Sequence, residues 1–386
     1  MLFRYLEAAI PTMSPNNLNI LESCFSSSWG GLEIHTLHEI SLLRQRGHRV
    51  WCACRKGSQL HTEAVRRGIQ SLPLSVTGYV HPLAVLRLGR ALKQLGIQVI
   101  HCQLSKDIAT LVPAMLLTRR KIPIVLSRRM GSAITKKDFF HRFTYRHVSR
   151  VLAISNVIHQ NVIDTTPMHP ENVITLHHGI NTEEFSPDRV DRAQIRKELG
   201  IEASELVIGF VGRFSPGKGH EEFLRAASML AGMHPQVRFL VVGEASFGEE
   251  EYERGILALC KDLGLESIVR FIGFRADIAS VMAAFDIFAF PSHAESFGSV
   301  LIEAMAMELP SVATNSDGVL DIVVDGETGV FVPPRDAGAL AGALARLIED
   351  PQLRLRLGRA AREHVKRFFG EEKLADGLER IYFSLV

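Results

Sequence analysis

The chain has 386 residues, of which 46% are hydrophobic and 22% charged, and its formal net charge is +2. This is the composition of a soluble globular protein, and the length suffices for two domains of ordinary size. No apolar run reaches the roughly 18 residues that a membrane-spanning helix needs. Residues 1–18 lack the apolar core and cleavage site of a secretion signal, so we expect a cytoplasmic protein.

The small net charge conceals a difference between the two halves. Residues 1–185 hold 22 Lys and Arg against 11 Asp and Glu, whereas residues 186–386 hold 22 against 31. Such an asymmetry usually indicates an anionic partner for the basic half. The five cysteines show no metal-binding or redox spacing and are expected to be buried thiols in a reducing compartment. Residues 1–12 are interpreted as a loose extension or a start-site artefact.

Apolar segments alternate with helical patterns along the whole chain, which predicts parallel sheets covered on both faces. The first half is expected to contain seven strands: Asn19–Phe25, Arg49–Ala53, Ser71–Leu74, Val99–His101, Ile124–Ser127, Arg150–Ile154 and Val173–Leu176. The second half is expected to contain six: Val207–Val211, Arg238–Val242, Ile268–Ile272, Ile287–Phe290, Ser311–Thr314 and Gly329–Val332.

In the second half, a glycine-rich turn from Gly212 to Gly219 follows the expected strand Val207–Val211 and precedes a helix. Arg213 and Lys218 lie in this turn. Cations and oriented N–H groups at a helix start are what a diphosphate requires. The segment nearly matches a P-loop, but Gly219 stands where Ser or Thr must bind magnesium, which disfavours an NTPase.

Further along, Glu295 and Glu303 are eight residues apart, on either side of an expected helix start near Ser299. The free N–H groups of such a helix start suit anionic or polyhydroxyl ligands. Carboxylates accept hydrogen bonds from the vicinal hydroxyls of sugars and ribose. Together with the phosphate turn, this segment predicts a nucleotide-sugar site that includes Glu295, Ser296, Phe297, Gly298, Ser299 and Glu303.

These two segments resemble the motifs of the retaining glycosyltransferases of family four, which have the GT-B fold. Five further segments resemble family motifs in the same order. They are Trp29–Glu33 (the N-terminal glycine loop), Val99–His101 (a strand end), His177–Asn181 (the interdomain turn), Ser316–Val323 (xGGxxEIV) and Asp325–Val332 (DGxTGxLV).

The resemblance implies an α/β protein of GT-B fold, with two Rossmann-like, doubly wound parallel-sheet domains that face a central cleft. Residues 1–185 would bind the acceptor, 186–204 would link the domains, 205–366 would bind the nucleotide sugar, and 367–386 would form a helix that crosses back to the first domain. The implied activity is retaining, metal-independent transfer of a hexose from a nucleotide-diphosphate sugar to a hydroxyl acceptor. Cell-surface glycan, lipopolysaccharide or glycolipid assembly is the expected context.

The same motifs indicate the site residues. Catalytic roles are expected for His101, Arg213, Lys218 and Glu295. Gly30, Gly31 and Phe274 are expected to complete the nucleotide-sugar site. Because no D-x-D motif is present, neither a metal nor a cofactor is expected, and Arg213 and Lys218 would stabilise the charge of the diphosphate. The donor is expected to be linked to UDP or GDP rather than to ADP, and no nucleic-acid partner is expected.

Some residues depart from the family pattern. Gln103 stands where a second histidine is frequent, Asp317 replaces a glycine and Asp321 replaces a glutamate. Lys106 and Asp107 are candidates for contact with acceptor or donor. A nucleotide-sugar epimerase, a phosphorylase-like enzyme and a non-catalytic sugar-nucleotide sensor remain alternatives on the same scaffold. A retaining hydrolase with paired carboxylates is disfavoured by the phosphate turn.

Residues 119–150 form a strongly basic segment, with ten cations, a single acid and interleaved aromatic residues. One interpretation is a core helix with a solvated basic back. The other is a surface that docks on an anionic glycan or an anionic lipid at the inner face of the cytoplasmic membrane. This surface would consist of Arg128, Arg129, Lys136, Lys137 and Arg142.

Overall fold

The computed structural model describes residues 17–76 and 81–386, so the interpretation of residues 1–12 lies outside the described residues. The chain forms two compact units. The first comprises residues up to Ala153 together with Asn161–Ile174 and Gly377–Val386, and the second comprises Ile154–Gln160 and Thr175–Asp376. Residues 186–204, expected to be a linker, fall in the second unit and contain the short helix α7 (Arg192–Glu198).

The first unit contains a seven-stranded sheet, as the apolar runs predicted. Its strands are β1 (Asn19–Cys24), β2 (Arg49–Arg55), β3 (Ser71–Leu74), β4 (Val99–Cys102), β5 (Ile124–Arg128), β6 (Val148–Ala153) and β7 (Val173–Thr175). They lie in the order β3-β2-β1-β4-β5-β6-β7, and the pairings from β3 to β6 are parallel.

The second unit contains a six-stranded parallel sheet. Its strands are β8 (Leu206–Val211), β9 (Val237–Val242), β10 (Val269–Phe271), β11 (Ile287–Phe290), β12 (Ser311–Thr314) and β13 (Val330–Val332). They lie in the order β10-β9-β8-β11-β12-β13. All thirteen strands expected from the sequence are therefore present, because strands buried on both faces are short, nearly continuous apolar runs.

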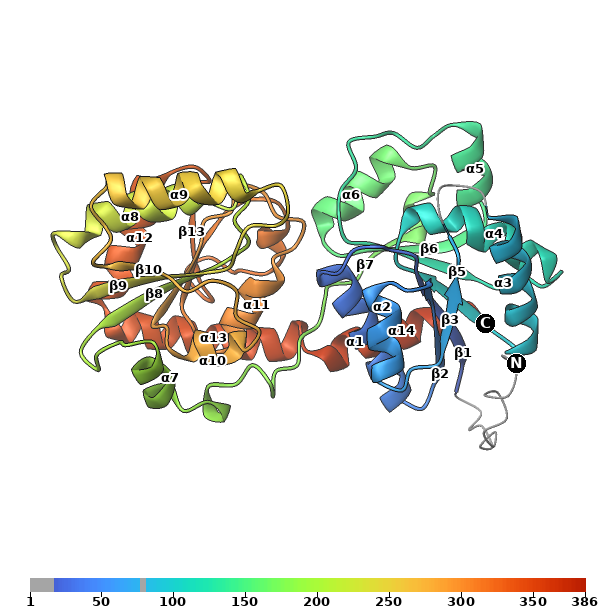
Figure 1. The fold of residues 1–386 in the computed structure, drawn as a ribbon, viewed down its shortest axis with the longest axis horizontal. Helices are drawn as coiled ribbons and strands as arrows, with labels where there is room; N and C mark the ends of the chain where they lie inside the picture. Colours follow the sequence, from blue (N-terminus) through green and yellow to red (C-terminus); the bar gives the residue numbers. More distant parts are fainter. Residues whose placement is uncertain (1–16, 77–80) are drawn as a thin grey trace. The chain divides into compact units, whose positions relative to one another are not determined.

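Helices connect the strands and cover both faces of each sheet (Figure 1). In the first unit they are α1 (Gly31–Gln45), α2 (Gln59–Arg66), α3 (Pro82–Gln94), α4 (Ile108–Leu117), α5 (Phe139–Tyr145) and α6 (Asn156–Thr165, shared with the second unit). In the second unit they are α8 (His220–Ala231), α9 (Glu250–Asp262), α10 (Ile278–Ala283), α11 (Ser299–Ala306), α12 (Ala337–Glu349) and α13 (Pro351–Phe368). The last helix, α14 (Glu371–Phe383), begins in the second unit and ends in the first.

Each sheet has one place where the strand order reverses direction. In the first sheet it lies between β1 and β4, and in the second between β8 and β11. At such a point the connections leave to opposite faces, which opens a crevice beyond the carboxyl ends of the two strands. Any ligand site of either unit is therefore expected beyond these strand ends.

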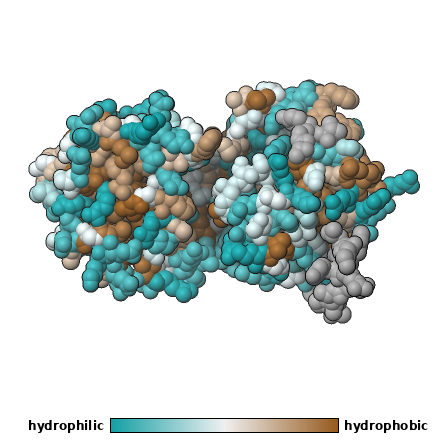
Figure 2. Space-filling view, viewed as in Figure 1, coloured by the Kyte–Doolittle hydropathy of each residue, from teal (hydrophilic) through white to brown (hydrophobic). Residues whose placement is uncertain are grey.

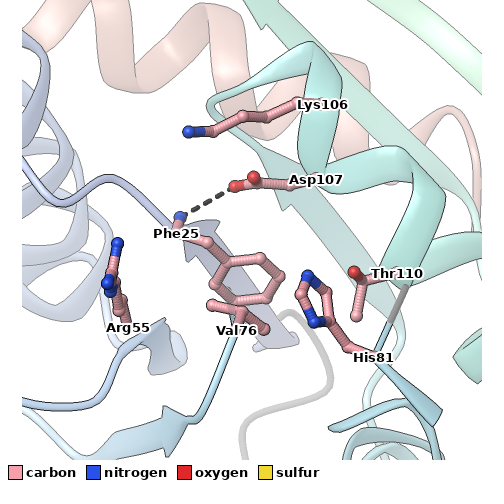
Figure 3. A pocket seen from close by; sticks show the side chains of 7 residues that line it. All are labelled: Phe25, Arg55, Val76, His81, Lys106, Asp107 and Thr110. Carbon is pink, nitrogen blue, oxygen red and sulfur yellow. Dashed lines mark hydrogen bonds between the residues drawn. The ribbon is translucent and has the colours of Figure 1, made fainter. Parts of the chain in front are cut away.

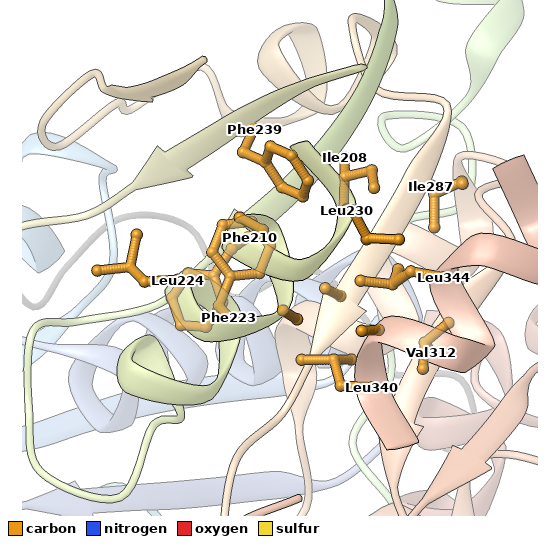
Figure 4. Close-up of a cluster of buried hydrophobic side chains, with 14 of the residues drawn as sticks. Ile208, Phe210, Phe223, Leu224, Leu230, Phe239, Ile287, Val312, Leu340 and Leu344 are labelled. Atoms are coloured by element: carbon orange, nitrogen blue, oxygen red, sulfur yellow. The ribbon is translucent and has the colours of Figure 1, made fainter. Parts of the chain in front are cut away.

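A continuous apolar core fixes the two central strands of the second sheet. Phe210, Phe223 and Phe239 pack against each other and against residues of α12 such as Leu340 and Leu344 (Figure 4). Burial of each such side chain stabilises the fold by roughly 1.5–3 kcal/mol. The core thus holds rigidly the strand β8, whose end carries the glycine-rich turn.

The face shown in Figure 2 is predominantly polar, with hydrophobic side chains scattered over it. Among the described residues, no helix is both long and apolar enough to cross a membrane. All five cysteines are free thiols and buried, as expected from their apolar surroundings.

Candidate functional site

The glycine-rich turn connects β8 to α8 in the second unit. Gly217 and Gly219 have φ values of +87° and +85°, in the left-handed region that favours glycine. A Cβ atom on Gly219 would lie 2.2 Å from the carbonyl oxygen of Pro291. Glycine is therefore required here both by the backbone conformation and by close approach to the end of β11.

The second predicted segment connects β11 to α11. Gly298 precedes the helix with φ +110°, and no side chain caps the helix start. The first N–H groups of α11 are consequently left for another acceptor. Phe297 is buried and stacks on His177, with ring centroids 5.6 Å apart, which fixes the course of the loop just before these N–H groups.

The two turns are in direct contact. The His293 N–H donates to the Gly217 carbonyl oxygen at 2.8 Å. The Lys218 ammonium forms an ion pair with the Glu295 carboxylate, which also accepts a hydrogen bond from the Ser292 hydroxyl at 3.2 Å. The structure thus brings together two residues that the sequence predicted separately as a phosphate-binding cation and a sugar-binding carboxylate.

Arg213 lies at the exposed side of the same turn. Its Nε is 3.3 Å from Oε2 of Glu249, in the loop before α9. Glu249 was not predicted from the sequence, because it stands in an acidic run that is typical of any helix start. Phe274, in the loop after β10, is also exposed. Both predicted residues are therefore accessible to a ligand.

Glu303 lies in α11 and is half-buried, as its apolar surroundings predicted. Burial raises the pKa of its carboxyl to about 8, and the charge of Glu184 adds to this effect. None of the hydrogen bonds or ion pairs among the described residues involves its carboxyl. A largely buried carboxyl with no internal partner is costly unless a ligand satisfies it.

The segment around η4 (Asp317–Asp321) packs on the loop of Glu295. A Cβ on Gly318 would lie 2.5 Å from the Ser296 carbonyl oxygen, and the Gly318 N–H donates to the Glu295 carbonyl oxygen at 2.9 Å. Asp321 accepts a hydrogen bond from the Asn156 N–H and pairs with His177 at 3.0 Å. The aspartate that replaces the usual glutamate therefore positions the His177 ring that stacks on Phe297.

His101, at the end of β4 in the first unit, is completely buried. Its Nδ1 is 2.8 Å from Oε1 of Glu22 and 2.7 Å from the Tyr382 hydroxyl, and its Nε2 is 2.9 Å from the Ser127 hydroxyl. Burial disfavours the imidazolium, but the charge and hydrogen bond of Glu22 outweigh it and raise the pKa of His101. The structure thus gives His101 an internal partner set, and its catalytic role remains a prediction.

The His101 cluster continues through the buried side chains of Gln103 and Glu39 and the partly buried side chain of Arg129. Gln103 donates to both Glu22 and Glu39, and Arg129 pairs with Glu39 at 2.7 Å. Atoms of Glu22, Glu39 and His101 that could bind a cation lie within 4.8 Å of one another. Arg129 already supplies a positive charge there, so the carboxylates are compensated within the protein.

Gly30 and Gly31 precede and begin α1. Gly30 has φ −176°, an extended conformation open to any residue. A Cβ on Gly30 or Gly31 would meet only side-chain atoms, at 3.8 Å and 3.9 Å. Both predicted residues lie after the end of β1, at the switch point of the first sheet. Their contact with a nucleotide sugar remains a prediction.

The basic segment separates into internal and exposed cations. Arg128 is 8% exposed and donates to the Ser105 hydroxyl, to which the Lys136 ammonium also donates at 3.0 Å. Together with Arg129, these side chains are engaged inside the unit. Lys137 and Arg142 are exposed and flank Phe139, which is 86% exposed, and Phe140, which is 55% exposed.

Comparison with protein families gives a match in each half of the chain. Residues 29–184 match the family described as Glycosyltransferase Family 4, and residues 191–364 match Glycosyl transferases group 1. The D-inositol 3-phosphate glycosyltransferases of Saccharomonospora viridis and Corynebacterium jeikeium are 37% and 38% identical over 219 and 214 residues. These stretches cover 55% and 54% of the chain and 50% of each relative, so the match spans about half the length of these curated relatives.

Solved structures resemble the whole chain. A glycosyltransferase from Rickettsia africae has a TM-score of 0.85 at 20% identity, covering 96% of this chain and 99% of that one. The Anabaena HepE protein in complex with UDP has a TM-score of 0.82 at 26% identity, covering 95% and 100%. HepE has also been solved with UDP-glucose, and that structure has a TM-score of 0.79 with the same identity and covers 96% and 100%.

Proposed function

The chain belongs to the family-four, group 1 glycosyl transferases and has their GT-B fold, and from this premise we propose that it transfers a sugar from a nucleotide-diphosphate sugar to a hydroxyl acceptor. The observation that carries the proposal is the contact between Lys218 and Glu295 beyond the adjoining strands β8 and β11. Glu303, in the helix that follows, has a carboxyl with no partner among residues 17–76 and 81–386. Cations for a diphosphate and carboxylates for hydroxyls are thereby assembled in one unit.

Each donor-site residue has a role in this proposal. Arg213 and Lys218 hold the diphosphate, helped by the free N–H groups of α11, because cations and a helix start both favour anions. Glu303 accepts hydrogen bonds from the ribose hydroxyls, and Glu295 contacts the transferred sugar. The UDP and UDP-glucose complexes of HepE support a UDP-linked hexose as the donor.

The proposed reaction retains the configuration of the sugar and uses no metal. The bond between the anomeric carbon and the diphosphate oxygen breaks while the acceptor oxygen bonds to the same face of that carbon. The acceptor proton passes to an oxygen of the departing diphosphate. Lys218 and Arg213 stabilise the negative charge that develops there, in an arrangement that needs no reorganisation during the step.

The first unit is proposed to bind the acceptor, in the assembly of a cell-surface glycan, lipopolysaccharide or glycolipid. Exposed Phe139 and Phe140 beside Lys137 and Arg142 support a peripheral position on the anionic inner face of the cytoplasmic membrane. Aromatic side chains insert at the lipid interface, while cations are attracted to anionic headgroups.

A thermal-shift panel with UDP-, GDP-, ADP- and CMP-linked hexoses tests the donor proposal, because a ligand that binds only the folded state raises its melting temperature. We expect the largest shift with a UDP-hexose. The same UDP-hexose should cause little shift in the double variant Lys218→Ala with Glu303→Gln. Slow release of sugar from the stabilising donor would distinguish a transferase from a sensor, and an unchanged hexose configuration would exclude an epimerase. Absence of a shift with every nucleotide sugar would reject the donor site.

A further inference from the structure

The first unit has a pocket of about 260 Å³ beyond the carboxyl ends of its central strands (Figure 3). Four strands contribute to it: Phe25 follows β1, Arg55 ends β2, Val76 follows β3, and Lys106 and Asp107 lie just after β4. His81 and Thr110 complete its lining. The pocket therefore lies at the switch point between β1 and β4, where an open parallel sheet binds its ligands.

Positive charge dominates the lining. Arg55 and Lys106 both line the pocket, and Figure 3 shows Lys106 above it and Arg55 at its left. No hydrogen bond or ion pair within the described part of the chain involves either side-chain charge. The Thr110 hydroxyl and the His81 ring lie together at one side of the space. An arginine, a lysine and a hydroxyl that line one cavity form a set of donors, and the residues that the structure describes supply no acceptor that is bonded to either cation.

Asp107 supplies the one carboxyl group among the lining residues, and it is engaged by the protein. Its Oδ2 accepts the Phe25 N–H at 2.8 Å. Burial raises the pKa of this carboxyl to about 7, against the opposing effects of the Phe25 N–H and of Lys106. Near neutral pH the carboxyl is therefore only partly charged and cannot neutralise both cations.

We propose that this pocket binds a phosphate monoester group of the acceptor, with Arg55 and Lys106 as its charged ligands and Thr110 as a further donor. Arginine matches phosphate oxygens with two parallel hydrogen bonds, and lysine acts as a compact point charge. The volume is below the roughly 300–1,000 Å³ of pockets that enclose a whole drug-sized ligand, so it suits a single substituent. This inference rests on the proposed function in one respect, namely that the first unit is the acceptor-binding unit.

The pocket can be tested separately from the donor site. The Arg213→Ala, Lys218→Ala variant lacks the cations of the proposed diphosphate site, so phosphate that still binds to it must bind elsewhere. We expect calorimetry at constant ionic strength to detect binding of glycerol 3-phosphate to this variant, and no binding of glycerol. Because nucleotide binding is measured on the unmodified chain, failure of the pocket leaves the donor-site result unaffected.

Further substitutions in that background locate the bound phosphate. Arg55→Ala with Lys106→Ala should weaken glycerol 3-phosphate binding at least tenfold. Arg90→Ala with Lys93→Ala removes two exposed cations of α3 outside the pocket and should leave it unchanged. Asp107→Asn keeps an acceptor for the Phe25 N–H without the charge, and should bind glycerol 3-phosphate at least as tightly at about pH 8.

Three results would overturn the proposal: no binding of glycerol 3-phosphate, equal weakening by the pocket and control substitutions, or weaker binding by Asp107→Asn. Equal melting temperatures of the variants establish that they fold. Vesicles that contain phosphatidic acid present the same headgroup on a lipid. If these vesicles compete with glycerol 3-phosphate in the control variant but not in Arg55→Ala with Lys106→Ala, the pocket also accepts a lipid-linked phosphate. If the competition is the same with and without Arg55 and Lys106, the pocket does not bind the lipid phosphate.

Discussion

At the level of single residues, the side chains of the proposed donor site differ in their partners. Lys218 and Glu295 neutralise one another, whereas Glu303 has no internal partner among the described residues. Lys218 and Glu295 are therefore expected to exchange one another for the ligand when a nucleotide sugar binds, whereas Glu303 is expected to gain a partner. These two situations predict different consequences of substitution.

We expect Arg213→Ala and Lys218→Ala each to lower turnover by roughly 10²-fold or more, the usual effect of removing a preorganised donor to developing charge. Both side chains are at least partly exposed, so the melting temperature should change little. Steady-state kinetics with the donor that gives the largest thermal shift measures the effect. Lys261→Ala, an exposed position in the last turn of α9, is the matched control. Near wild-type turnover in both variants would show that the diphosphate binds elsewhere.

Glu303 should make nucleotide affinity depend on pH. Its pKa in the folded protein is raised from the ordinary value of 4.5 to about 8, so the carboxyl contributes stability at low pH that is lost as the pH rises through 8. Ribose hydroxyls donate to the charged form, and binding should therefore release a proton. We expect the affinity for the nucleoside diphosphate to increase between about pH 6 and about pH 9.

Calorimetry in buffers of different ionisation enthalpy measures this proton release. Glu303→Gln should abolish the Glu303-dependent part of it and weaken binding by about 1.5–3 kcal/mol at high pH, the contribution of a hydrogen bond to a charged group. Glu327→Gln, at an exposed position, should change neither quantity. Unaltered affinity and proton release in Glu303→Gln would reduce this residue to a packing role.

At the level of elements, α5 and α14 have contrasting surroundings. Helix α5 presents Phe139 and Phe140 to solvent. The sequence alone had also allowed these aromatic residues to lie on the buried side of a core helix. Helix α14 places Tyr382 entirely inside the first unit, beside His101. Helix α5 thus has an exposed apolar surface, and α14 supplies a buried polar contact to His101.

Helix α5 should bind anionic membranes. We expect the protein to sediment with vesicles that contain anionic lipid, to be released by high salt, and not to sediment with neutral vesicles, because each cation near an anionic surface contributes about 1 kcal/mol. Lys137→Glu with Arg142→Glu should weaken this binding and leave nucleotide affinity intact. Arg90→Glu with Lys93→Glu reverses the same number of charges on α3. Loss of sedimentation in both variants alike would indicate only a general charge effect.

Tyr382→Phe should destabilise the first unit by about 1–3 kcal/mol, because it removes the hydroxyl that contacts Nδ1 of the buried His101. Urea unfolding measures the loss, and hydrogen exchange should show reduced protection in β1 and β4. The control is Tyr252→Phe in the second unit, whose hydroxyl donates to Glu221 at 2.7 Å in a partly exposed position. A smaller loss for Tyr382→Phe than for this control would mean that the His101 cluster does not depend on α14.

At the level of the whole molecule, the two units carry opposite charge and different binding groups. The first unit contains most of the basic half of the sequence and the pocket of Arg55 and Lys106. The second contains the glycine-rich turn with Arg213 and Lys218, and also Glu295 and Glu303. This division supports one unit for an anionic acceptor and the other for the donor.

Sugar transfer by the protein is expected to continue in the presence of EDTA, because Arg213 and Lys218 are proposed to provide the charge that a divalent ion would otherwise supply. Product formation with and without the chelator, followed by addition of Mg²⁺ or Mn²⁺, measures this. Complete loss of activity with EDTA, restored by either ion, would contradict metal-independent transfer.

The sequence by itself determined the thirteen strands, the glycine-rich turn and the half-buried environment of Glu303. These features depend on short apolar runs and on residues close together in the chain, so local patterns suffice to identify them. Only the tertiary structure decided which cations are internal: Arg128 and Lys136 share the Ser105 hydroxyl, whereas nearby Lys137 is exposed.

The tertiary structure likewise decided that Lys218 pairs with Glu295, that His101 is enclosed, and that Arg55 and Lys106 converge on one pocket. Each of these contacts joins residues that are distant in the chain and become neighbours through the order of the strands. A strand pattern does not specify that order, because parallel strands with similar apolar sequences can pair in several arrangements until the helices pack between them.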